Sequence, residues 1–332
     1  MTLPARIPVA ILTGFLGAGK TTLLNYILHA EHGRRIAVLV NDFGAVNIDA
    51  QLIVGVEDDT IQLSNGCICC TLRGALEETL LAVAHRPDPP EYIIIETSGV
   101  ADPKAVVVTL LLSEELNAVI EVDSILTVID AEQIRALRVE YAQLAKSQIS
   151  VADIVLLNKI DLVSKAEVAA LKAWIQQITP TARIVETSYG QAPLALLLGV
   201  DHALQPETLL TEPALDVHVH EAGEAHVHDH HLLFHTWTYT SAHPLALEAV
   251  RKTVQQLPTT IFRVKGFLFL REQPEQRALL QAVGRRVQID LGGQPWGDQP
   301  PRTQLVVIGV AGGVDPTALH AAFEACVSEN DE

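Results

Sequence analysis

The stretch Gly14-Phe15-Leu16-Gly17-Ala18-Gly19-Lys20-Thr21-Thr22 decides the fold of this 332-residue chain. It follows a short apolar run, residues 8–13, that predicts a buried strand, and it leads into residues 20–30, which predict a helix. A glycine-rich turn between a strand and a helix is the context that a phosphate-binding P-loop requires. The alternative is a turn that binds no ligand, but all four fixed positions of the motif and both flanks favour the P-loop.

The chemistry of this loop predicts how it would hold a nucleotide. Glycines let backbone N–H groups turn inward around an anion, and the helix N-terminus adds its positive dipole end. The Lys20 ammonium is expected to reach the β- and γ-phosphates, and the Thr21 hydroxyl to complete a Mg2+ site. The residues expected to contact the phosphates are Gly14, Gly17, Ala18, Gly19, Lys20, Thr21 and Thr22.

Composition excludes several classes of protein. Hydrophobic residues make up 48% and charged residues 19% of the chain, which is enough for a large core and argues against global disorder. A net charge of −17 argues against non-specific nucleic-acid binding. Apolar runs are interrupted well short of a membrane span, and the N-terminus leads almost directly into the first expected strand. We therefore expect a cytoplasmic protein with no membrane segment and no signal peptide.

The order of apolar segments predicts the fold class. Strands alternate with helices over residues 8–200, which predicts a doubly wound, mostly parallel sheet with ligands at the carboxyl ends of its strands. We expect this P-loop domain at 1–200, a His-rich linker at 201–231 and a smaller α+β domain at 232–332. In the last domain we expect strands near residue 232, at about 260–270, 285–291 and 304–310, and helices at 243–256 and 316–327.

Carboxylates follow two of the expected strands. Residues 91–96 form an apolar strand that ends at Glu96, before Thr97-Ser98-Gly99. Glu96 is expected to hold Mg2+ through water, and the Gly99 N–H to meet the γ-phosphate. Asp42 and Asp49 lie in a polar loop after the second strand, where a γ-phosphate-sensing switch would lie. Each of these two acids is equally compatible with an ordinary turn. The expected catalytic set is Lys20, Thr21, Glu96 and Asp49.

The segment Asn158-Lys159-Ile160-Asp161 indicates which base is bound. It follows an apolar strand, residues 153–157. A carboxylate accepts two hydrogen bonds from guanine N1–H and its exocyclic amine, whereas adenine has no matching donor pair. Asp161 would take this part, Asn158 would contact the base edge, and the Lys159 stem would pack over the ring. The sequence therefore predicts GTP and GDP as ligands.

Three of the four cysteines occur together, at Cys67, Cys69 and Cys70. They are too close in sequence to form a disulfide framework, and thiolates at the start of a helix favour metal binding. Three thiolates need a further ligand for a tetrahedral shell, and Asp42 is one candidate. The alternative is a cluster of small buried apolar residues.

The expected linker is rich in histidine. Neutral imidazoles bind Zn2+, Co2+, Ni2+ and Cu2+, and a flexible tract can gather them without a preformed site. A hydrophilic linker without a metal role is the alternative. The histidines concerned are His218, His220, His226, His228, His230 and His231.

These motifs, taken in one order, resemble the CobW family of P-loop GTPases, which are related to the nickel-insertion GTPases of hydrogenase and urease. The resemblance covers nearly the whole chain, including the His-rich linker and the C-terminal domain. It implies a GTP-dependent metallochaperone with zinc or cobalt as cargo, and a metal site at Cys67, Cys69 and Cys70 beside the nucleotide switches. Where the family loop commonly reads Asn-Glu-Phe-Gly-Glu, this chain has Asp42 and Ala45, so the remaining metal ligands can differ.

Two other functions stay open at this stage. A zinc storage or buffering protein would use the His tract and the cysteines, with nucleotide in a structural role. A P-loop kinase for a small molecule is disfavoured by the guanine-specific segment at 158–161. For a chaperone we expect a client metalloprotein as partner, no nucleic acid, and either a monomer or a homodimer that depends on nucleotide or metal.

Overall fold

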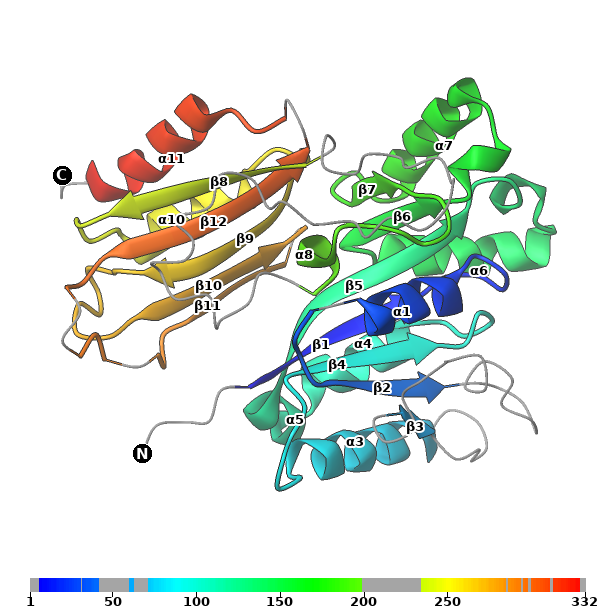
Figure 1. Cartoon of the computed structure of the whole chain (residues 1–332), viewed down its shortest axis with the longest axis horizontal. Helices are drawn as coiled ribbons and strands as arrows, with labels where there is room; N and C mark the ends of the chain where they lie inside the picture. The colour runs from blue at the N-terminus through cyan, green and yellow to red at the C-terminus, as the bar shows by residue number, and fades with distance from the viewer. Residues whose placement is uncertain are drawn as a thin grey trace. The chain divides into compact units, whose positions relative to one another are not determined.

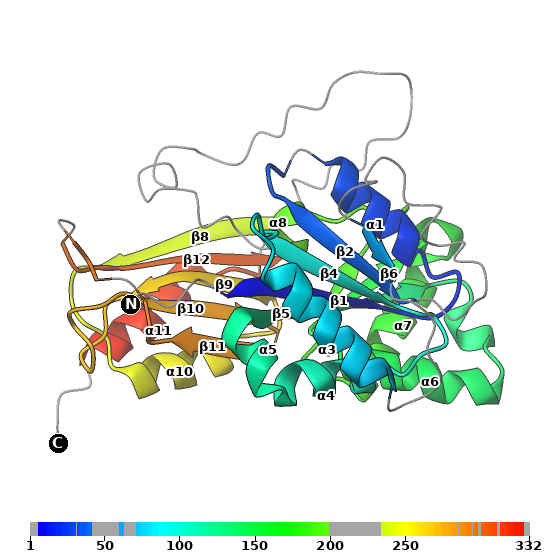
Figure 2. The same ribbon diagram turned by 90° about the horizontal axis from the view of Figure 1, so that it is seen from below.

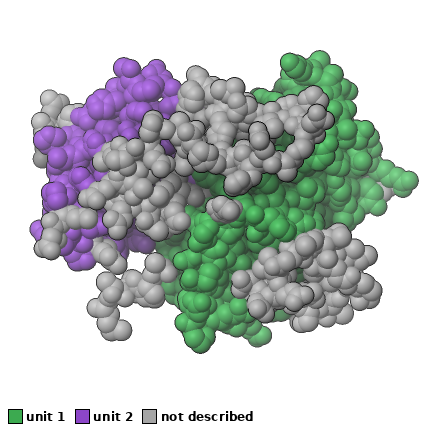
Figure 3. Space-filling view, viewed as in Figure 1, with its two compact units in different colours: residues 1–198 green, residues 199–332 purple. Residues whose placement is uncertain are grey.

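The chain forms two compact units, residues 1–198 and 199–332 (Figure 1, Figure 3). The structure is a computed structural model. It describes residues 6–30, 32–41, 60–62, 71–198, 234–284, 286–293, 295–297, 300–310 and 313–328.

The first unit is built on a seven-stranded sheet in the order β3-β2-β4-β1-β5-β6-β7. Each neighbouring pair of strands is parallel, so all the carboxyl ends lie at one edge. The strands are β1 (Ile7–Thr13), β2 (Ile36–Asn41), β3 (Thr60–Gln62), β4 (Tyr92–Thr97), β5 (Ile120–Asp130), β6 (Ile154–Asn158) and β7 (Arg183–Glu186). The predicted doubly wound parallel sheet is confirmed.

Helices cover both faces of this sheet (Figure 2). α1 lies on one face, and α3, α4, α5 and α6 lie on the other. Between β5 and β7, α6 and α7 share one apolar core with β6. The helices are α1 (Lys20–His29), α3 (Thr71–Ala84), α4 (Lys104–Leu112), α5 (Glu114–Val119), α6 (Val139–Ser150), α7 (Lys165–Ile178) and α8 (Leu194–Leu197), with short 3-10 turns η1 (Ile134–Ala136) and η2 (Ile160–Leu162). Among the helices described here, none is both long and apolar enough to span a bilayer.

The central strands are buried and largely apolar because both of their faces are covered. All six residues of β4 are buried. Val9, Ile11, Ile93 and Ile95 pack against Leu80 of α3 in one continuous core. This core holds the carboxyl ends of β1 and β4 side by side, where the candidate site lies.

Strand β5 begins at Ile120, four residues before the start at residue 124 that we expect from the sequence. Two acids, Glu121 and Asp123, make its first part look exposed in the sequence. Both are buried: Glu121 lies 3.3 Å from the Arg6 guanidinium, and Asp123 accepts a 2.6 Å hydrogen bond from the Tyr92 hydroxyl. Because partners distant in sequence offset the cost of burying these carboxylates, the strand extends through them.

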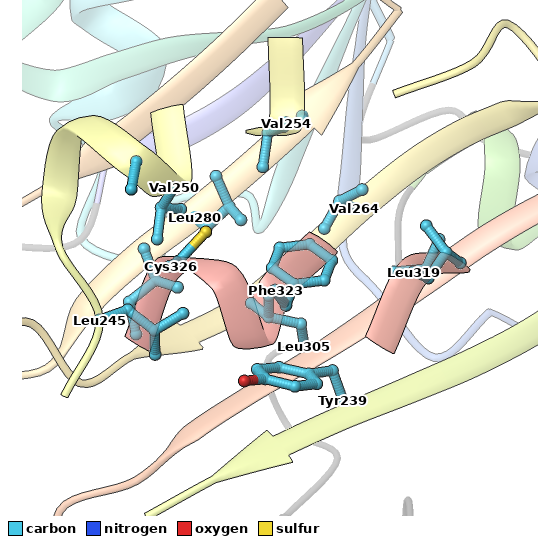
Figure 4. Close-up of a cluster of buried hydrophobic side chains, with 14 of the residues drawn as sticks. Tyr239, Leu245, Val250, Val254, Val264, Leu280, Leu305, Leu319, Phe323 and Cys326 are labelled. Atoms are coloured by element: carbon cyan, nitrogen blue, oxygen red, sulfur yellow. The ribbon is translucent and has the colours of Figure 1, made fainter. Parts of the chain in front are cut away.

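The second unit is an antiparallel five-stranded sheet in the order β11-β10-β9-β12-β8, with two helices. Figure 4 shows Phe323 and Leu319 of one helix packed against strand residues that include Tyr239, Val264 and Leu305. The elements are β8 (Phe234–Ser241), α10 (Leu247–Gln255), β9 (Ile261–Leu268), β10 (Ala278–Val283), β11 (Arg286–Asp290), β12 (Thr303–Val310) and α11 (Pro316–Ser328). The predicted α+β class is confirmed.

Strand β10 is absent from the strands that we expect from the sequence. Its sequence, Ala-Leu-Leu-Gln-Ala-Val, consists largely of good helix formers and has no alternating pattern. It forms a strand because β9 and β11 hydrogen-bond to both of its edges. Tertiary pairing therefore overrides local propensity here.

Candidate functional site

Polar residues gather at the carboxyl edge of the first sheet, at the ends of adjacent strands. The order of strands reverses around β1, because β2 lies beyond β4 on one side and β5 lies on the other. In open α/β sheets, ligands bind at such a switch point. The P-loop follows β1, Glu96 and Thr97 end β4, and Asn158 ends β6.

The P-loop closes tightly between β1 and α1. The Ala18 N–H donates to the Phe15 carbonyl at 3.2 Å, which forms a turn inside the loop. The Lys20 ammonium is buried and donates to the carbonyls of Gly14 at 3.0 Å and Phe15 at 3.4 Å. Among the side chains described, none caps the N-terminus of α1. Backbone N–H groups at such a helix start are suited to donate to an anion.

Glycine is required at position 19 for two reasons. Gly19 has φ of 106°, a left-handed conformation that L-residues with a side chain rarely adopt. A Cβ atom at this position would also lie 2.4 Å from the Asn158 side-chain nitrogen. The end of the P-loop is therefore fitted against the end of β6.

The Asn158 amide joins three parts of the site. Its nitrogen donates to the Ala18 carbonyl at 2.9 Å, and its oxygen accepts from the Thr187 hydroxyl at 3.1 Å and the Gly190 N–H at 3.0 Å. The side chain is buried, so these bonds are shielded from water. Asn158 therefore holds the P-loop and the loop after β7 in one arrangement, a role that the sequence alone does not indicate. Its expected contact with the base edge stays a prediction.

An ion pair holds Lys159 next to the same edge. Its ammonium lies 2.7 Å from a carboxylate oxygen of Asp130, which ends β5. The second Asp130 oxygen accepts from the N–H groups of Glu132 and Gln133, so the carboxylate is fixed on both sides. We did not assign Asp130 a role from the sequence. The available signal was an acid at the end of an apolar strand, the same signal that singled out Glu96.

The end of β4 lies beside the start of the P-loop. The register of the two strands pairs Glu96 with Leu12, and the Thr97 hydroxyl donates to the Thr13 hydroxyl at 2.9 Å. Glu96 is buried, with 2% of its surface exposed. This position is compatible with the predicted support of Mg2+ at Thr21, because a buried carboxylate next to a phosphate loop supplies the oxygen ligands that Mg2+ prefers.

Several predicted site residues lie outside the described residues: Asp42, Asp49, Cys67, Cys69, Cys70, His218, His220, His226, His228, His230 and His231. Among the residues that the structure does describe, no group of three His, Cys, Asp or Glu side chains could hold a metal ion. The strands that lead into the acid and cysteine segments are described. β2 ends at Asn41, which pairs with Thr97, and β3 ends at Gln62, which pairs with Val40.

Comparison with known proteins identifies the family. The family described as "CobW/HypB/UreG, nucleotide-binding domain" matches residues 8–186, which is more than half of the chain. The chain belongs to the CobW family of P-loop GTPases. The CobW C-terminal domain matches residues 234–327, within the second unit. The family resemblance drawn from the sequence motifs is therefore confirmed.

Among individual CobW relatives, a "zinc chaperone CobW" of Sinorhizobium sp is 32% identical, over 97% of this chain and 98% of that protein. The "zinc chaperone YjiA" of Escherichia coli is 31% identical, over 96% of this chain and 98% of its own length. The match to the crystal structure of Zn(II)-bound YjiA GTPase from E. coli covers 97% of this chain and 99% of the YjiA chain, at 26% identity and a TM-score of 0.46. A "zinc-regulated GTPase metalloprotein activator 1" of Dictyostelium discoideum is 37% identical over 58% of this chain and 48% of that protein.

Proposed function

We propose that this CobW protein is a GTP-dependent metallochaperone that binds one transition-metal ion at Cys67, Cys69 and Cys70 and delivers it to a client metalloprotein. Zinc is the first candidate cargo, because full-length relatives are named zinc chaperones. Cobalt is the second candidate, since thiolate-rich sites accept both ions. Asp42 is the candidate fourth ligand. The His tract at 218–231 would serve as a secondary, weaker metal site.

The nucleotide would lie across the carboxyl edge of the first sheet. The phosphates would meet the backbone of Gly14, Gly17, Ala18 and Gly19, together with Lys20, Thr21 and Thr22, and Gly99 would meet the γ-phosphate. The buried lysine within the P-loop and the uncapped start of α1 support this assignment. Thr21 would hold Mg2+, with Glu96 or Asp49 in support, and the ion would neutralise phosphate charge. Asp161 would select guanine, with Asn158 and Lys159 beside the base.

One observation carries the coupling of metal to nucleotide. β2, β3 and β4 are parallel neighbours, so the chain leaves the sheet after Asn41, after Gln62 and after Thr97 at the edge that carries the P-loop. The segment after Asn41 contains Asp42 and Asp49, and the segment after Gln62 contains the three cysteines. The two segments that carry the candidate metal ligands therefore leave the sheet at the edge where the γ-phosphate would bind, which supports the proposed coupling.

The reaction follows from this arrangement. Water attacks the γ-phosphorus, the bond to the oxygen that bridges the β- and γ-phosphates breaks, and GDP and phosphate leave. A γ-phosphate that orders residues 42–49 and 96–99 would change the metal shell, and metal binding would change nucleotide affinity by the same factor. We expect slow intrinsic hydrolysis, because the sequence offers no arginine that can be assigned to the γ-phosphate.

The test is a competitive Zn2+ and Co2+ titration of the reduced protein, with Mg2+ and either GDP or a non-hydrolysable GTP analogue. The proposal expects one tight site whose affinity differs about tenfold between the two nucleotides, a typical coupling. A Cys67/Cys69/Cys70→Ser variant should lose this site. Deletion of 216–231 is the matched control, and it should remove weak sites alone.

Two outcomes would contradict the proposal in different ways. Equal metal affinity with GDP and the analogue would remove the coupling but leave a metal site. Binding that ignores the cysteines and disappears with the His tract would instead make the protein a zinc buffer with a structural nucleotide. We expect a monomer or a nucleotide- or metal-dependent homodimer, which light scattering of the same samples would distinguish.

A further inference from the structure

Gln148 is a buried polar residue that none of the motifs includes. It lies on α6, between Ala145 and Ile149, which face the apolar core, and it is itself 1% exposed. A glutamine at this position has to find hydrogen-bond partners inside the protein, because an unpaired buried amide is costly. Its partners identify what it does.

The Gln148 side-chain nitrogen donates to two carbonyls of the loop that follows β4. The distances are 3.2 Å to the Gly99 oxygen and 3.2 Å to the Ala101 oxygen. Because both partners are acceptors, only the nitrogen of the amide can face them, which fixes the orientation of the side chain. One amide group thus bridges the carbonyls of the residues before and after Val100.

Gly99 is in turn fitted against the P-loop. A Cβ atom at Gly99 would lie 2.7 Å from the Leu16 backbone nitrogen, so the two backbones touch. Gln148 and Leu16 also line the same small pocket, together with residues at the end of β5.

We propose that Gln148 is a positioning residue that holds the Gly99 peptide ready for the γ-phosphate. This inference rests on the proposed assignment of Gly99 to the γ-phosphate. Gln148 fixes the Gly99 and Ala101 carbonyls on both sides of Val100. The Ala101 N–H in turn donates to the Ser98 carbonyl at 3.0 Å, which holds the Ser98–Gly99 peptide group whose N–H would donate. A hydrogen-bond donor that is already fixed needs no reorganisation when the γ-phosphate binds, so it stabilises the phosphate charge better than a mobile donor does.

The same helix holds this loop at a second point, which supplies a matched control. The Ser147 hydroxyl donates to the Asp102 carboxylate at 3.1 Å, on the exposed side of α6. Asp102 also caps the start of α4 through the Lys104 N–H. The contact joins the same helix to the same loop, but it is three residues from Gly99 and open to solvent.

The experiment compares Gln148→Met, which keeps the length but has no donor, with Ser147→Ala. Affinities for GDP and for a non-hydrolysable imido analogue of GTP are measured by fluorescence with Mg2+ and without transition metal. We expect Gln148→Met to lower analogue affinity about tenfold, the effect of one hydrogen bond, while GDP affinity changes less than about twofold. kcat for GTP should fall in parallel, and Ser147→Ala should leave both affinities unchanged.

A wild-type ratio of analogue to GDP affinity in Gln148→Met would overturn the proposal. An equal loss of affinity for both nucleotides, together with a lower Tm, would also overturn the proposal, because Gln148 would then only support the fold. If Gln148→Met does not fold, Gln148→Asn takes its place, because it keeps the amide but shortens its reach. This variant should then lose affinity for the GTP analogue and not for GDP. The assay contains no transition metal, so failure of the metal-site proposal leaves its result unchanged.

Discussion

Replacement of Asn158 by alanine tests whether this side chain holds the nucleotide site together. The substitution removes a hydrogen bond to the Ala18 carbonyl and one from the Gly190 N–H, both at a buried position. Each buried backbone group left without a partner costs about 1–3 kcal/mol. We therefore expect the free energy of unfolding to fall by about 2–6 kcal/mol.

Thr187→Val is the matched control, because it preserves shape and removes one member of the same network. The Thr187 hydroxyl donates to the Asn158 oxygen, which keeps the Gly190 N–H as a partner in the variant. A single neutral hydrogen bond contributes about 0.5–1.5 kcal/mol. The control should therefore be clearly more stable than Asn158→Ala.

Thermal unfolding of the nucleotide-free chain measures the difference. For a domain of this size, each kcal/mol lowers Tm by about 2–4 °C. Asn158→Ala should therefore unfold roughly 4–24 °C below wild type, and Thr187→Val within roughly 6 °C of it. Fluorescence titration with GDP should show weaker binding in Asn158→Ala, because the Ala18–Gly19 peptide loses its support. Unfolding free energies of the two variants that agree within about 0.5 kcal/mol would refute the reasoning.

Three further changes have expected outcomes. Gly19→Ala should reduce GDP affinity at least about tenfold, because φ of 106° and a 2.4 Å contact with Asn158 exclude a Cβ atom. Gly33→Ala is the control, since Gly33 has φ of 64° and open space around it; it should cost only about 1–2 kcal/mol of stability and leave the GDP titration unchanged. Asp130→Asn should weaken GDP binding about fivefold, because it releases the Lys159 ammonium from its ion pair. In a Lys159→Met background the same substitution should weaken GDP binding no further, and additive losses of GDP affinity in calorimetry would contradict this. Burial and the nearby Arg34 guanidinium lower the pKa of His32 in the folded protein, so the unfolded chain binds more protons than the folded one as pH falls. The stability of the wild type should therefore drop from pH 7 toward pH 5, and the urea midpoint of His32→Gln should depend less on pH. Identical pH slopes for the variant and the wild type would argue against this role of His32.

The predictions for the phosphate and base segments rest on chemistry that is local in the sequence. Glycine spacing, a following lysine and threonine, and an apolar run before them specify the P-loop without reference to distant residues. The roles of Asp130 and Gln148 were not predictable in this way. Their partners, Lys159 and the Gly99 carbonyl, are 29 and 49 residues away in the chain. A sequence shows an acid or an amide, but not which distant donor or acceptor it will meet.

The limits of sequence patterns are clearest at two strands. The first part of β5 contains two acids, and only the approach of Arg6 and Tyr92 makes their burial favourable. The β10 segment has the composition of a helix, and its strand depends on neighbours at both edges. In both cases the deciding interaction is long-range, so a local pattern contains no trace of it.

The sequence by itself determined the family, the parallel direction of the strands in the first unit and the kinds of side chain at the candidate site, because these depend on periodicity and on short motifs. Tertiary structure alone decided which of those side chains meet. It joined the Asn158 amide to Ala18, Thr187 and Gly190, and it placed Gln148 against the Gly99 loop. The physical reason is that hydrogen bonds and ion pairs act over about 3 Å, a separation that packing sets and that distance along the chain does not reveal.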